Sequence, residues 1–393
     1  MSNTKAMERA VIALVKSAID GSRADISEDV LPNELLQYGN RHKLIPLLYY
    51  GAVNSGIDLG EMCASFENAV LSNIVIDQQQ QLALADLQKT FDAHAIEYMP
   101  LKGVLLKPLY PKTEMRPMGD SDILIRMSQR GAAHAVMLEQ GYTFEKESAH
   151  ELVYKKGKIR VELHKCLIPP YNKDYYAYYG DGWKLARKSD GSETRYEMRD
   201  DDQLVYLFTH FAKHYRDGGI GVLHMVDFFV YMRAKTIDYT YVREELVKLK
   251  LADFYDNIHA TVNAWFSDGP ESEMTDFITH RMFANGDWGT ETTKAMAEAV
   301  KTSKATSVKG IGRKRVLHVL FPSREQLQYR YPILKKHSYL LPMVWIARGG
   351  EVLLFKRDRL HSRALTLRRT TAENVSAYQS ELNYVGLDFN FKE

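Results

Sequence analysis

Two aspartates, Asp120 and Asp122, lie two residues apart where a turn leads into an apolar stretch, in the run RPMGDSDILI at residues 116–125. Side chains alternate across a β-strand, so both carboxylates would project from one face while the apolar residues pack against the other. Two like charges about 6 Å apart repel by roughly 3 kcal/mol at an effective dielectric near 20. A bound cation would offset this repulsion, and the pair therefore predicts a metal site.

A third carboxylate, Glu162, occurs in the run KIRVELH that ends at His164. The same alternation places Glu162 on one strand face with Arg160 and His164. Carboxylate oxygens on adjacent strands suit Mg²⁺ and Mn²⁺, and Mg²⁺ usually combines one or two carboxylates with substrate phosphates and water. We therefore predict that Asp120, Asp122 and Glu162 bind divalent ions and catalyse metal-assisted phosphoryl transfer. The alternative is an ordinary solvated strand edge or turn.

A second group of residues could contact phosphate. Gly103, at the predicted start of a short helix, would let backbone N–H groups approach a phosphate, and Lys102 would add a positive charge. Lys-Gly pairs are also common in turns, so a purely structural role stays open. Arg116, four residues before Asp120, could hold a triphosphate or could pair with the aspartates.

Two histidines, His210 and His214, lie one helical turn apart in the run YLFTHFAKH. With Asp227 or His224 they could form a zinc site, although the glutamate of the HExxH arrangement is absent. The two histidines could instead pack within the helical region, or contact a nucleotide or an acceptor. Asp227 lies in an apolar and aromatic run, so its carboxylate needs a partner, for which His210 and His214 are candidates.

The spacing of apolar residues predicts the elements that must position these groups. Apolar residues three and four apart predict a long helix over 66–91. Alternation and turn residues then predict strands and short helices, and the chain becomes helical again after residue 200. The predicted strands span 96–101, 120–125, 150–155 and 158–165, the predicted helices span 104–110, 129–140, 204–215 and 223–234, and residues 169–191 are expected to form an irregular aromatic loop.

These elements predict an α+β fold in which a small mixed sheet lies between N-terminal helices and a large helical C-terminal region. We expect an N-terminal helical region over residues 1–92, a catalytic core over 93–198 and a helical region over 199–393. The last region is expected to close over the cleft that holds the carboxylates.

Composition narrows the class of protein. The 393 residues include 52 basic and 50 acidic side chains, a net charge of +2, which disfavours long nucleic acids as partners. Two cysteines are too few for a disulfide framework or a cysteine-built zinc site, so a reducing cytoplasm is the expected location. Charges interrupt the apolar stretches near both ends of the sequence, and hence neither a secretory signal nor a membrane span is predicted.

Several of these motifs together carry a resemblance to a known family. They are residues 101–103, 116–122, 162–164, His210, 213–214, Asp227, 331–332 and 341–342, and they extend over most of the chain. In combination they resemble the uncharacterised nucleotidyltransferase family within the polymerase-beta-like superfamily. The resemblance implies a mixed-sheet nucleotidyltransferase core with two divalent ions on the paired aspartates. The superfamily usually has a Gly-Ser or Gly-Gly turn before the acidic pair and often an aspartate as the third carboxylate, whereas this sequence has Lys102-Gly103 and Glu162.

With this resemblance, the sequence predicts an enzyme that uses Mg²⁺ or Mn²⁺ to move a nucleoside monophosphate from an NTP such as ATP to a hydroxyl or similar group, releasing pyrophosphate. A metal-dependent phosphoester hydrolase and a non-catalytic nucleotide-binding protein are the alternatives. The acceptor (a sugar, a small amine, a protein hydroxyl or a nucleic acid end) and the oligomeric state are left open by the sequence. The residues expected to contact the nucleotide are Lys102, Gly103, Arg116, Gly119, His164, His210 and His214.

Overall fold

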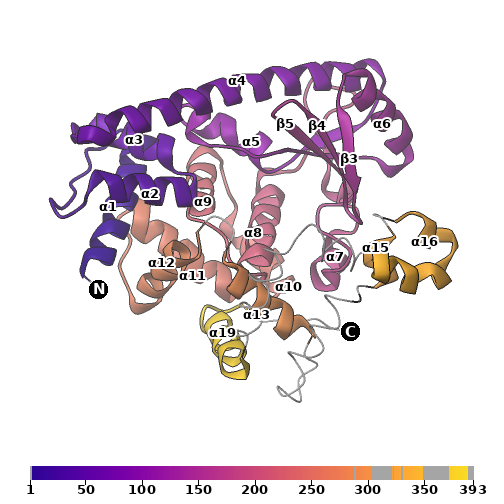
Figure 1. Ribbon diagram of the computed structural model, residues 1–393. Helices are drawn as coiled ribbons and strands as arrows, with labels where there is room; N and C mark the ends of the chain where they lie inside the picture. Colours follow the sequence, from indigo (N-terminus) through magenta and orange to yellow (C-terminus); the bar gives the residue numbers. More distant parts are fainter. Residues whose placement is uncertain are drawn as a thin grey trace.

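The computed structural model describes residues 2–286, 289–302, 321, 323–328, 331–347 and 371–387. It shows the predicted α+β fold, in which one five-stranded mixed sheet is surrounded by helices (Figure 1). Within these residues, no helix is long and apolar enough to cross a membrane.

The N-terminal region consists of four helices, α1 (Ser2–Asp20), α2 (Pro32–His42), α3 (Ile45–Ser55) and α4 (Cys63–Ala93). Helix α4 runs along one edge of the molecule (Figure 1). One end contacts α3, and the other end contacts the sheet and helix α6 (Arg130–Glu139). The buried stripe of α4, which includes Phe66, Val70, Leu87 and Phe91, confirms the helix predicted over 66–91. The same helix also buries two polar side chains, and these prove to matter for the site.

The sheet contains β1 (Tyr98–Pro100), β2 (Ser121–Ile125), β3 (Thr143–Glu147), β4 (Glu151–Lys156) and β5 (Ile159–His164), in the order β1-β2-β5-β4-β3. Strands β2 and β5 are parallel, and the other neighbouring pairs are antiparallel. The short α5 (Gly103–Leu106) follows β1, and α6 (Arg130–Glu139) follows β2. Strand β3 was not predicted, because four of its five residues are exposed and this edge strand carries no apolar alternation.

The two faces of the sheet pack in different directions. Ile123 and Ile125 of β2 join Val161 and Leu163 of β5 in a core that also contains Leu87 and Phe91 of α4 and residues of α6. Leu124 of β2 belongs instead to the large core shared with the C-terminal helices. The predicted alternation is therefore confirmed. The side chains of Asp122 and His164 lie on the face toward the C-terminal helices.

The C-terminal region is mainly helical. Its described helices are α8 (Asp200–Arg216), α9 (Leu223–Ala234), α10 (Tyr239–Lys248), α11 (Ala252–Phe266), α12 (Glu273–Asn285), α13 (Glu291–Thr302), α15 (Arg324–Leu327), α16 (Ile333–Lys336) and α19 (Ala372–Tyr384). The prediction of an irregular loop over 169–191 was wrong in part, because α7 (Lys173–Tyr179) lies within it. Tyr175 and Tyr179, one turn apart, are buried in the large core, which explains why this aromatic segment coils into a helix.

Candidate active site

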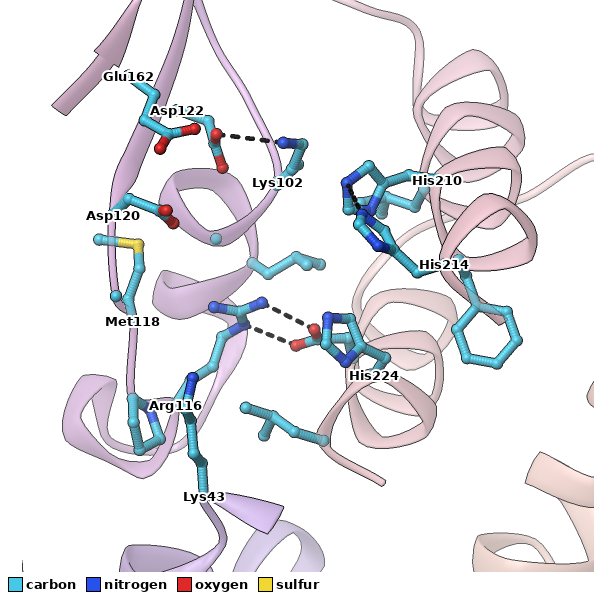
Figure 2. A pocket seen from close by; sticks show the side chains of 18 of the residues that line it. Lys43, Lys102, Arg116, Met118, Asp120, Asp122, Glu162, His210, His214 and His224 are labelled. Atoms are coloured by element: carbon cyan, nitrogen blue, oxygen red, sulfur yellow. Dashed lines mark hydrogen bonds and ion pairs between the residues drawn. The ribbon is translucent and has the colours of Figure 1, made fainter. Parts of the chain in front are cut away.

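The predicted carboxylates line one wall of a cavity of about 240 Å³ between the sheet and helices α8 and α9 (Figure 2). Asp122 on β2 and Glu162 on β5 are direct partners in the parallel pairing of these strands. Asp120 directly precedes β2 and also lines the cavity. The structure thus brings the three predicted catalytic residues to one place, as the alternation of side chains requires.

The carboxylate of Asp122 is buried and firmly held. Its Oδ1 accepts a hydrogen bond from Lys102 Nζ at 3.1 Å and lies 2.6 Å from Nε2 of His164. Burial raises the pKa of Asp122, but the charge of Lys102 and the bond to His164 outweigh burial and hold the pKa well below its usual range. Asp122 is therefore ionised and fixed in orientation before any ligand binds.

The other two carboxylates show the repulsion expected for such a cluster. Burial, followed by the negative charges of Asp120 and Glu151, raises the pKa of Glu162 to about 8. Burial and the charge of Asp122 likewise raise the pKa of Asp120. Arg160 contacts Oε1 of Glu162 at 3.1 Å and offsets part of this charge. The remaining repulsion favours a bound cation.

The donor atoms fit a divalent cation. One ligand atom from each of Asp122, Glu162 and His164 lies within 4.8 Å of the other two. Two carboxylate oxygens and an imidazole nitrogen form a donor set that Mn²⁺ and related ions accept, and Mg²⁺ accepts the oxygens. Asp120 was predicted as a ligand and His164 as a nucleotide contact, but it is His164 that belongs to this close group, while Asp120 lies beside it in the cavity.

A fourth carboxylate, Glu151 of β4, was missed by the sequence analysis. It is the cross-strand partner of His164 and lines the same cavity. Burial raises its pKa, but its contact with His150 at 2.9 Å and the charge of that histidine outweigh burial and lower the pKa to about 2. The sequence did contain a signal for this residue. Side chains alternate along the predicted strand 150–155, so the face of the sheet to which Glu151 belongs could have been assigned in the same way as for Glu162.

The Lys102-Gly103 turn has an unusual backbone. Lys102 adopts φ 46° and ψ −116°, a conformation that costs a residue with a side chain on the order of 1–3 kcal/mol. At Gly103, a Cβ atom would lie 2.8 Å from the Arg116 guanidinium and 2.8 Å from the Met118 sulfur. The glycine is therefore explained by close packing of these side chains, and α5, which follows it, is a single turn.

Arg116 binds Asp227, which is neither of the two partners suggested by the sequence, a triphosphate and the aspartates of the acidic pair. Its Nε and Nη2 donate to Oδ1 and Oδ2 of Asp227 at 2.7 and 2.8 Å, and Tyr110 donates to Oδ1 at 2.7 Å. The partner of Asp227 is thus this pair of residues, and neither His210 nor His214. Because both ions are buried, the pair fixes the loop before Asp120 to helix α9.

Helix α4 holds the same loop from the other side. Gln80 Nε2 donates to the carbonyl oxygen of Met118 at 2.7 Å, and its Oε1 accepts from Lys107 at 3.2 Å. Lys107 in turn pairs with the buried Asp77 at 2.5 Å. A Cβ at Gly119 would meet no atom within 4 Å, so packing does not require the glycine beside Met118.

The wall opposite the carboxylates carries histidines and lysines. His210 and His214 project from α8 and His224 from α9, with Lys102 reaching into the space between them and the carboxylates (Figure 2). The Nε2 atoms of His210 and His214 are 3.1 Å apart. Burial and the charge of Lys102 hold the pKa of His210 well below its usual range, so this imidazole is neutral. Within the described chain these histidines form no metal-like group, which disfavours the zinc site.

Comparison with known proteins gives one match. Residues 28–267 match the sequence profile of a family described as uncharacterised nucleotidyltransferase. The chain belongs to this family. The matched segment contains every residue of the acidic cluster and of the histidine wall. Family membership indicates the type of reaction, nucleotidyl transfer, without naming a substrate or an acceptor. No curated protein and no solved structure matches the chain.

The strained backbone of Lys102 yields a stability prediction. Lys102→Gly and Lys102→Ala both remove the ammonium, but only glycine adopts φ 46° without strain. We expect the glycine variant to be more stable than the alanine variant by about 1 kcal/mol in urea unfolding. The same pair at Lys89, on the exposed face of α4, is the control, where alanine should be the more stable. Equal stabilities of the two Lys102 variants would contradict the strain.

The ion pair between Arg116 and Asp227 yields a second prediction. Arg116→Met leaves the buried Asp227 carboxylate without its main partner and should lower the free energy of unfolding by about 3 kcal/mol. Adding Asp227→Leu removes the stranded charge and should restore part of the loss, because the buried Tyr110 hydroxyl then lacks its acceptor. Denaturant unfolding of both variants without nucleotide is the measurement. An Arg116→Met variant as stable as the parent would contradict a stabilising role of this ion pair.

Proposed function

We propose that this protein is a metal-dependent nucleotidyltransferase of the polymerase-beta-like type. It transfers a nucleoside monophosphate from an NTP to a hydroxyl or similar group of an acceptor and releases pyrophosphate. The observation that supports this most is the parallel pairing of β2 and β5, which sets Asp122 beside Glu162 within a cavity. Family membership supports the same reaction class.

In this proposal the acidic wall holds the ions and the reacting phosphate. Asp122 and Glu162, with Asp120 and His164 beside them, would bind Mg²⁺ or Mn²⁺, which when bound supplies positive charge to the α-phosphate and to the leaving pyrophosphate. The acceptor oxygen forms a bond to the α-phosphorus, and the bond from that phosphorus to the bridging oxygen breaks. Glu162 is the candidate to take the acceptor's proton, because it lines the cavity beside Asp122.

The residues around the acidic wall would mainly position it. Lys102 and His164 fix Asp122 through its Oδ1, and the contacts to α4 and α9 fix the loop that carries Asp120. Arrangements of this kind act by holding reactants and charges in place rather than by covalent chemistry. Lys213, His210 and His214, on the opposite wall, are the candidates to contact the nucleotide or the acceptor.

The acceptor can be sought directly. The protein is incubated with each of the four ribonucleoside triphosphates, Mg²⁺ or Mn²⁺ and a cell extract, and the products are screened by mass spectrometry for nucleotide adducts while pyrophosphate release is measured. Adducts with release of pyrophosphate would support the transferase. Release of phosphate to water without pyrophosphate would support a hydrolase, and tight nucleotide binding without metal dependence or transfer would support a binding protein.

Asp122 gives the test by substitution. Asp122→Asn keeps the shape of the side chain but removes the charge that orients an ion, so activity should fall by at least about 100-fold. Thermal unfolding should show a folded protein. Asp86→Asn, at an exposed position of α4, is the matched control and should retain the parent's activity. Turnover near the parent level in Asp122→Asn would rule out this site.

A further inference from the structure

Lys102 has an unfavourable backbone conformation in a turn that the surrounding structure nevertheless holds in place. Its φ of 46° is unfavourable for any residue with a side chain. The turn is nevertheless held in place, because the neighbouring Leu101 N–H donates to the carbonyl oxygen of Asp122 at 3.0 Å. Strained residues cluster at functional sites, and the side chain of Lys102 reaches into the cavity. The ammonium is therefore the part to explain.

The ammonium lies among the proposed metal ligands. Lys102 Nζ is 3.1 Å from Oδ1 of Asp122, the same oxygen that His164 contacts at 2.6 Å. Asp122, His164 and Glu162 are the three residues whose ligand atoms lie within 4.8 Å of one another. In the free protein, Lys102 thus provides the positive charge that a divalent cation would provide in the complex.

The two cations cannot both stay at this position at low cost. A divalent ion and an ammonium about 5 Å apart repel by roughly 2 kcal/mol even at the dielectric of water, and by more in a partly dry cavity. Lysine can respond, because its charge is carried on a flexible four-carbon stem. Figure 2 shows where it can go, since Lys102 extends into the space between the carboxylates and the histidines of α8.

We propose that Lys102 is a displaceable counter-ion that binds Asp122 in the free protein and passes to the polyphosphate of the NTP when a divalent cation binds. This inference rests on the proposed function. It assigns Lys102 two successive partners, a carboxylate and then a phosphate. It also makes metal and nucleotide binding cooperative, because the cation releases the ammonium that the phosphate needs.

The test compares two probes on the variant Lys102→Met, which keeps the length of the side chain and loses its charge. One probe is Mn²⁺ alone, and the other is the preformed complex of Mn²⁺ with inorganic tripolyphosphate, both measured by calorimetry on the full chain. Mn²⁺ alone should bind roughly tenfold more tightly, because a charge about 5 Å away has been removed. The tripolyphosphate complex should bind roughly tenfold more weakly, because a charge-assisted contact is lost.

The opposite signs separate this proposal from simpler roles of Lys102. If the lysine stayed on Asp122 throughout, both probes would bind more tightly or neither would change. If it only maintained the fold of the site, both would bind more weakly. Either pattern would overturn the exchange. Lys102→Gly, which also relieves the backbone, must give the same two shifts, so a folding defect in the methionine variant cannot hide the answer.

Arg160→Met is the matched control. Arg160 also pairs with a ligand carboxylate, Glu162, at 3.1 Å, but among the described residues it does not belong to the cavity lining. Its removal should therefore shift both probes in the same direction, and opposite shifts here would show that the two-probe pattern is not specific to an exchanging lysine. Transfer activity of the parent is measured in parallel. Transfer with no opposite shifts in Lys102→Met overturns the exchange alone, whereas a parent that neither binds Mn²⁺ nor transfers overturns the proposed function as well.

Discussion

Repulsion among buried carboxylates is the constraint on which the rest of this structure depends. Asp120, Asp122, Glu151 and Glu162 line one cavity, and burial together with their mutual charge raises the pKa values of Asp120 and Glu162. No apolar packing would bring four acidic side chains together, since each loses hydration when buried. The surrounding structure must hold them there, and it does so with a parallel strand pair and with polar contacts that reach the site from both sides.

Those contacts come from helices far apart in the sequence. Gln80 of α4 binds the backbone of Met118, and Asp227 of α9 binds Arg116 in the same loop. The loop that leads to Asp120 is thus fixed between the N-terminal and the C-terminal helices, while β2 and β5 fix Asp122 and Glu162. The helical regions therefore have a direct part in the geometry of the acidic site.

Local patterns in the sequence were enough to predict the acidic face. They could not predict contacts between residues far apart in the chain. Asp122 and Glu162 could be placed because strand alternation is a local rule, and the same rule could have found Glu151. The pairing of Arg116 with Asp227 spans 111 residues and leaves no local signal. The positive φ of Lys102 was hidden for a similar reason, because a lysine at such a turn is held by the fold around it and not by its own preference.

The charge distribution also bears on how a nucleotide could be held. The guanidinium of Arg116 is occupied by Asp227, and His210 is neutral, so much of the positive charge that the sequence offered for phosphate binding is already used or absent. The acidic wall repels a triphosphate until its own charge is compensated. A nucleotide would therefore depend on a bound cation for most of its affinity, which is the behaviour of an NTP-using transferase and the opposite of what a metal-independent nucleotide-binding protein needs.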